Sequence, residues 1–307
     1  MNKQFVLTTI FLILTVARTD AQLLFRISGA GLEKPSYMLG SVHHLSGSLL
    51  DSIPVYQDAL AHCQQMYVEY LLTGNRIVTI LQPQTAEMLP DGKTIFEFID
   101  EESAEILKEK FKEACGMDLI GSPFESFKYT QPAELLSFLS LSLESQIKKH
   151  DPRFNNGGMD YSCMLKAQVQ GWKVGELDEE DLITQDLREQ QEKLFPTVEA
   201  QADSLMRFLK GYEEHKLRLS ERYESVYNYW TASDYEGFAS YLLSEVDQHP
   251  KIFRNRNQNW LPKMEAAMQE APTMFVFGAG HLIGAYGIVQ LLRQAGYEVE
   301  QMTEKHI

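Results

Sequence analysis

Two strand-like apolar runs, one near each end of the chain, stop at a glycine and are followed three residues later by a histidine. The first segment runs from Tyr37 to His43 and the second from Phe275 to His281. Each is typical of a buried strand that turns at its carboxyl end, where α/β proteins usually bind ligands. The repetition predicts that His43 and His281 end two strands and share one site.

The remaining apolar periodicity predicts an α/β chain. Strands are expected at 23–27, in the run leading into Gly40, and at 66–70, 173–177, 273–277 and 297–302. Helices are expected at 54–60, 103–114, 132–147, 163–169, 260–270 and 283–295, and residues 185–244 are helical in pattern. The strand leading into Gly40, the helix at 54–60 and the strand at 66–70 together have the size of a βαβ unit. Parallel pairing of the two strands is the default for such a unit. The expected fold class is α/β, with α+β as the alternative.

The first 21 residues resemble a secretory signal peptide. Lys3 precedes an apolar stretch of about a dozen residues, and a small-residue cleavage site follows at 19–21. That stretch is short for a transmembrane anchor. The pattern predicts cleavage before Gln22 and export to a periplasm or the exterior, without stable membrane insertion. The mature residues 22–307 suffice for one large domain.

Composition narrows the classes of partner. The net charge of −15 argues against binding to nucleic acid or to anionic lipid, which would call for basic clusters. The acidic clusters at 100–102 and 176–181 are interpreted as solvated surface. Cys63, Cys115 and Cys163 are odd in number and widely spaced, so we interpret them as core thiols, with one bridge still possible.

Two histidines need further ligands to make a catalytic metal centre, which commonly has three protein ligands. Glu69 is the first candidate, because it ends a strand expected to neighbour the one leading to His43, and it could bind the metal or act as general base. Asp160 is a weaker candidate that could instead cap a helix. His44 adjoins His43 and is assigned to the surroundings of the site.

A basic and amide-rich segment precedes the last α/β portion of the chain. Arg256 and Asn257 could bind a substrate carboxylate or stabilise an oxyanion, or Asn257 could cap the following helix. The sequence contains no complete G-x-G-x-x-G loop, no nucleophile elbow, no phosphate loop and no His-Glu-x-x-His pair. The histidine pair therefore remains the principal candidate site.

Taken together, these segments resemble the TraB/PrgY/GumN family. The residues that carry the resemblance are Gly40-Ser41-Val42-His43, Val68-Glu69, the Asp160 region, Gly175-Glu176-Leu177-Asp178, Arg256-Asn257-x-x-Trp260 and Phe277-Gly278-Ala279-Gly280-His281-Leu282. That family is similar to the Tiki metalloproteases and, more distantly, to erythromycin-esterase and ChaN-like haem-binding groups. This chain departs from the family pattern at His44, where a small or apolar residue is more usual.

The resemblance implies two related α/β halves forming a mixed, largely parallel sheet, with a helical insertion at about 185–250. It also implies a divalent metal, Mn²⁺ or Co²⁺ before Zn²⁺, held by His43 and His281 with Glu69 in the catalytic set. The function we expect is an exported hydrolase acting on a peptide or protein substrate, with no oligomeric state specified. The alternatives are a non-catalytic protein that binds haem, a signal peptide or a saccharide, and a structural role for both histidines.

Overall fold

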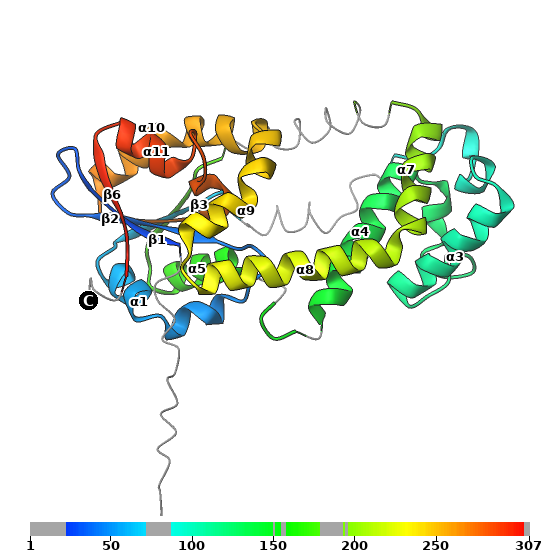
Figure 1. Ribbon diagram of the computed structural model, residues 1–307, viewed down its shortest axis with the longest axis horizontal. Helices are drawn as coiled ribbons and strands as arrows, with labels where there is room; N and C mark the ends of the chain where they lie inside the picture. The colour runs from blue at the N-terminus through cyan, green and yellow to red at the C-terminus, as the bar shows by residue number, and fades with distance from the viewer. Residues whose placement is uncertain are drawn as a thin grey trace, which may run out of the picture.

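The computed structural model describes residues 23–71, 87–149, 151–154, 158–178, 193 and 196–303. The predicted signal peptide lies outside these residues, as does part of the predicted helical insertion. Within them, a sheet with helices on both faces is joined to a separate group of helices by the long helix α8, Tyr212–Thr231 (Figure 1). No helix of the described chain is both long and apolar enough to cross a membrane.

The sheet confirms the predicted fold class. Its six strands, in the spatial order β4-β3-β5-β2-β1-β6, are β1 Leu24–Gly29, β2 Ser36–Ser41, β3 Gln65–Val68, β4 Lys173–Glu176, β5 Thr273–Gly278 and β6 Tyr297–Gln301. The pairs β2–β5, β3–β5 and β3–β4 are parallel, whereas β1 pairs antiparallel with both β2 and β6. The sheet is therefore mixed and largely parallel.

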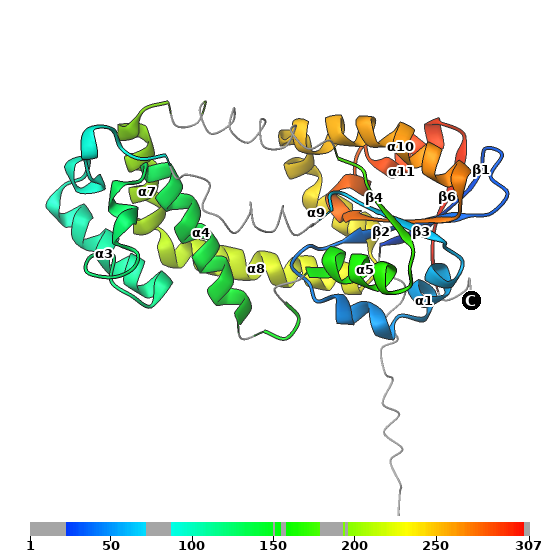
Figure 2. The same cartoon turned by 180° about the vertical axis from the view of Figure 1, so that it is seen from behind.

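Helices cover both faces of the sheet, as the two opposite views show. One face carries α1, Pro54–Ala61, and α5, Gly158–Val169, and the other carries α10, Arg256–Glu270, and α11, Ile288–Gln294 (Figures 1 and 2). Helix α11 begins five residues later than expected. Gly284 has a positive φ of 82°, a conformation that a helix cannot contain, and it separates the turn after His281 from the helix.

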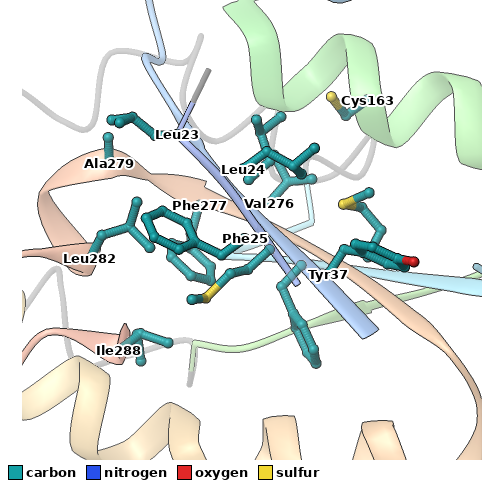
Figure 3. Packing of buried hydrophobic residues seen from close by; sticks show 14 of the residues in the cluster. Leu23, Leu24, Phe25, Tyr37, Cys163, Val276, Phe277, Ala279, Leu282 and Ile288 are labelled. Carbon is teal, nitrogen blue, oxygen red and sulfur yellow. The ribbon is translucent and has the colours of Figure 1, made fainter. Parts of the chain in front are cut away.

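The larger hydrophobic core lies on both sides of the sheet. Every residue of β2 and β5 is buried, which explains why both strands are apolar apart from the serine and threonine residues at their ends. Figure 3 shows side chains of this core from β1, from β5 and from the chain after β5, among them Leu24, Phe25, Val276, Phe277, Leu282 and Ile288. The buried Trp230 of α8 joins this core and donates a hydrogen bond of 2.9 Å from Nε1 to the carbonyl of Gly40. The far end of α8 is thereby fixed to β2.

The second core belongs to the group of helices. It is formed by α3 Glu101–Cys115, α4 Pro132–Lys149, α7 Val198–Lys210 and the start of α8, with short 3₁₀ turns at Pro90–Gly92, Ile95–Glu97 and Glu125–Tyr129. Phe111 and Leu139 are fully buried within it. Helical residues at 101–149 therefore pack with those of the later region expected to be an insertion.

The chain returns to the sheet through α9, Tyr235–Gln248, and a π-helical turn, Lys251–Asn255, which runs directly into α10. Two further 3₁₀ turns follow strands of the sheet, at Gly47–Ser52 and Ala279–Leu282. π-helical turns are rare and are frequently found at functional sites. This one carries Phe253 and leads into Arg256, both of which contact His281.

Candidate functional site

Three parallel strands bring His43, Glu69 and His281 to one edge of the sheet. His43 follows β2, Glu69 follows β3, and His281 lies in the 3₁₀ turn after β5. The expectation that the strands before His43 and Glu69 are neighbours is wrong, because β5 pairs with both and lies between them. Nevertheless, His43 Nε2 lies 3.5 Å and His281 Nε2 lies 3.8 Å from the same oxygen, Oε1 of Glu69.

Gly278, the last residue of β5, allows these groups to meet across the intervening strand. A Cβ at this position would lie 2.7 Å from His43 Nε2 and 3.2 Å from Glu69 Oε1. The backbone N–H of Gly278 also donates a hydrogen bond of 2.6 Å to that Glu69 oxygen. The glycine of the second Gly-x-x-His segment is thus required by its contact with the first histidine, rather than by its own φ.

The ring of His43 is oriented by Asp160, at the start of α5. His43 Nδ1 donates to Asp160 Oδ2 at 2.9 Å, and the hydroxyl of Ser41 donates to Oδ1 at 2.6 Å. Gly158 makes this approach possible, since its φ is positive and a Cβ there would lie 2.0 Å from the carbonyl oxygen of His43. Nε2 of His43 is therefore the ring nitrogen directed to the shared Glu69 oxygen.

The ring of His281 is oriented in the same way by the buried side chain of Asn257. His281 Nδ1 donates to Asn257 Oδ1 at 2.6 Å, while the Asn257 amide donates to the carbonyls of His281 and Tyr286 at 3.0 and 2.8 Å. This network places the proton of His281 on Nδ1 and leaves a lone pair on Nε2. The ring packs on Trp260, with centroids 4.3 Å apart.

Arg256 completes the site and links it to Asp178, a carboxylate of the acidic run at 176–181. Its guanidinium pairs with Glu69 Oε2 and donates to His281 Nε2 at 3.1 Å. It also forms a two-point ion pair with Asp178, with N–O distances of 3.0 and 2.7 Å. Asp178 is only 9% exposed and accepts a further hydrogen bond from Trp260. The interpretation of Asp178 as solvated surface is wrong.

The charges at the site follow from burial and from these partners. The Asp160 carboxylate raises the pKa of His43 to about 10, against the opposing effect of burial. Burial lowers the pKa of His281 to about 3. Burial alone would raise the pKa of Glu69, but the surrounding imidazole and guanidinium groups outweigh it and lower that pKa to about 2. At neutral pH, Glu69 is therefore a carboxylate between a protonated His43 and a neutral His281, and a metal ion bound at His43 Nε2 would have to displace the proton there.

A cleft of about 500 Å³ opens above these groups. Its floor contains His43, Glu69, Arg256 and His281, and its walls come from the segment after β2, from α4, α8 and α9, and from the π-helical turn. The wall residues are His44, Glu144, Leu219, Arg222, Tyr223, Val226, Phe238, Leu242, Glu245, Ile252 and Phe253. A smaller cavity of about 90 Å³ reaches His43 and Glu69 from the side of α5. The site is therefore accessible to a ligand larger than water.

The family pattern of TraB/PrgY/gumN proteins matches residues 23–301, which is nearly the whole described chain. The chain belongs to the TraB/PrgY/gumN family. A stretch of 64 residues is 39% identical to Metalloprotease TIKI2 of Danio rerio, covering 20% of this chain and 11% of that protein. The chain thus spans about a tenth of the length of this curated relative. No solved structure matches the chain.

For this member of the TraB/PrgY/gumN family, the residues proposed from sequence fall into two groups. His43, Glu69, Asp160, Arg256 and His281 meet directly at the site, with Asn257 behind His281. His44 turns away from them toward α4 and α8. Two members of the site, Asp178 and Ser41, were not predicted from the sequence. The available signal for Asp178 was its position two residues after β4, at the same edge of the sheet as Glu69.

As the structure stands, no three His, Cys, Asp or Glu side chains within the described residues are close enough to hold a metal ion. The donor types nevertheless fit one. Around a metal with bonds of about 2.1 Å, tetrahedral donors lie about 3.4 Å apart, close to the 3.5 and 3.8 Å from the two Nε2 atoms to Glu69 Oε1. In both imidazoles, Nδ1 donates to a fixed oxygen, as in most metal-binding histidines.

Proposed function

We propose that this chain is a metal-dependent hydrolase that cleaves peptide bonds, with His43, His281 and Glu69 as the metal ligands. The observation that carries the proposal is the convergence of two oriented imidazoles on one carboxylate oxygen above Gly278. Membership of the TraB/PrgY/gumN family and the partial similarity to a metalloprotease support the same chemistry.

Imidazole and carboxylate donors suit several divalent ions, and we propose Mn²⁺ or Co²⁺ ahead of Zn²⁺. A divalent cation held there would supply Lewis-acid polarisation of a substrate carbonyl and activation of water. For Nε2 of His281 to serve as a ligand, the Arg256 guanidinium must move away from it, because it now donates a hydrogen bond to that atom. In the described structure, Arg256 therefore occupies the position in front of His281 Nε2 that a metal ion would take.

Glu69 and Arg256 have separate roles in the proposal. Both carboxylate oxygens of Glu69 are fixed, Oε1 by the Gly278 N–H and Oε2 by Arg256, which suits a ligand that keeps its orientation. Arg256 lines the floor of the cleft and is the cationic donor suited to an oxyanion that develops on the substrate. The side chain of Asn257 is fully engaged by His281 and Tyr286, so we assign it to the positioning of His281.

A peptide library incubated separately with Mn²⁺, Co²⁺ and Zn²⁺, and analysed by mass spectrometry, tests the proposal. We expect cleavage that stops on addition of a chelator, returns with the metal, and is lost in His43→Ala and His281→Ala. His62→Ala is the matched control, because His62 is an exposed histidine that contacts Asp58 and not the cleft. Peptide binding without cleavage would favour the non-catalytic alternative, and activity that survives both site substitutions would exclude this mechanism.

Export is also part of the proposal and is supported by the charged, apolar and small-residue segments of positions 1–21. We expect the mature protein to begin at Gln22 and to occur in the periplasm or the medium. Mass spectrometry of the amino-terminal peptide from fractionated cells measures both. An intact Met1 on protein that remains in the cytoplasmic fraction would contradict export.

A further inference from the structure

The wall of the cleft beside His43 includes the imidazole of His44, which has no role in the proposed metal site. His44 turns toward α4 and α8, where its ring meets Tyr223 edge to face, with centroids 5.6 Å apart. Lys148 of α4 lies 2.9 Å from His44 Nδ1 and 2.9 Å from Glu144 Oε2. Tyr223 donates to that same Glu144 oxygen at 3.0 Å, which closes the network.

This network determines the protonation of His44. An ammonium group has only donors, so the contact with Lys148 requires Nδ1 of His44 to be the acceptor. The ring is then neutral, with its proton on Nε2. No described residue accepts a hydrogen bond from this Nε2 atom, and His44 lines the cleft together with His43. A wall residue of the cleft, adjacent in sequence to one proposed metal ligand, therefore carries a neutral imidazole with its N–H donor fixed on Nε2.

We infer that His44 is a positioning residue that donates from Nε2 to a backbone carbonyl of the peptide in the cleft. The inference rests on the proposed function and specifies how the substrate is held. A peptide presents one backbone carbonyl acceptor per residue, so a carbonyl is the partner that a peptide in the cleft offers to this donor.

The tautomer can be measured without any substrate. Imidazole nitrogen chemical shifts of the native protein should show His44 protonated at Nε2 and unprotonated at Nδ1. In Lys148→Met, which removes the donor, the shifts should move toward a mixture of both tautomers. A native His44 protonated at Nδ1, or a tautomer that does not change in Lys148→Met, overturns the inference.

The positioning role is measured with the best-cleaved peptide of the library. His44→Leu should raise KM about 3- to 10-fold, the value of one hydrogen bond, and leave kcat and Mn²⁺ affinity close to those of the native protein. His44→Gln, whose amide offers an N–H donor, should restore most of the loss. Lys148→Met should give a smaller rise in KM, and it also serves if His44→Leu does not fold.

The outcomes separate this inference from the proposed function. An active native protein whose KM is the same in His44→Leu overturns the role of His44 alone. A fall in kcat and Mn²⁺ affinity at constant KM also overturns it, since His44 would then act by holding His43. A native protein that binds metal and cleaves no peptide overturns the proposed function, and this inference with it.

Discussion

Gly278 is the position where the smallest change should have the largest effect on the site. In Gly278→Ala, the added Cβ would lie 2.7 Å from His43 Nε2, whereas an ordinary contact starts at about 3.4 Å. The His43 imidazole must therefore move by about 0.7 Å, either alone or together with the Glu69 carboxylate. Metal sites tolerate ligand displacements of about 0.2 Å, so we expect metal affinity to fall at least 10- to 100-fold, the range seen when the support of a ligand is lost.

The same substitution should have little effect on overall stability. The His43 side chain is 51% exposed and can turn toward solvent, so the cost of overpacking should lie near the lower end of 1–3 kcal/mol, a Tm decrease of a few degrees. Isothermal titration with Mn²⁺ and a thermal melt measure both quantities. Gly211→Ala is the control, because its φ of −95° suits alanine and its nearest Cβ contact, 3.3 Å, is only about 0.1 Å shorter than an ordinary one. Wild-type Mn²⁺ affinity in Gly278→Ala would refute the reasoning.

Two further predictions concern stability and reactivity. Asn257→Leu leaves one imidazole N–H and two carbonyls of the buried network without their partner, and should lower the free energy of unfolding in urea by about 3 kcal/mol. Asn259→Leu, on the exposed face of the same helix, should change it by less than about 0.5 kcal/mol, and equal losses would contradict the role of the network. Burial raises the pKa values of Cys63 and Cys163 to about 12, so at pH 8 a thiol reagent should label the partly exposed Cys115 first. Equal rates at all three thiols in the native protein would contradict that burial.

Much of the fold and of the candidate site follows from the ends of strands. Apolar runs that stop at glycine identified the positions of His43 and His281, because parallel strands end at one edge of a sheet. Glu69 was found by the same reasoning. The order of the strands was not predictable. β5 is formed by residues more than 200 positions after β3, and the apolar pattern alone does not show that β5 inserts between β3 and β2.

The parts of the site that escaped prediction depend on burial. Asp178 looked like one member of an acidic, solvated run, but its chain position two residues after β4 brings it under Arg256 and Trp260. Local composition does not show which carboxylate of such a run faces inward. Likewise, position 278 requires glycine because the His43 ring lies against it. These two residues are far apart in the sequence, so the sequence pattern does not show this contact.

Direct metal binding by the native protein tests the central claim most closely. Protein freed of metal with a chelator and titrated calorimetrically with Mn²⁺, Co²⁺ or Zn²⁺ should bind one ion per chain. Its free energy of unfolding should rise by about 2.7 kcal/mol when the free ion is at one hundred times Kd. The variant carrying His43→Ala and His281→Ala should lose both effects, while His62→Ala keeps them. The absence of binding by any of the three ions, or equal binding by the double variant, would contradict a metal centre at His43, Glu69 and His281.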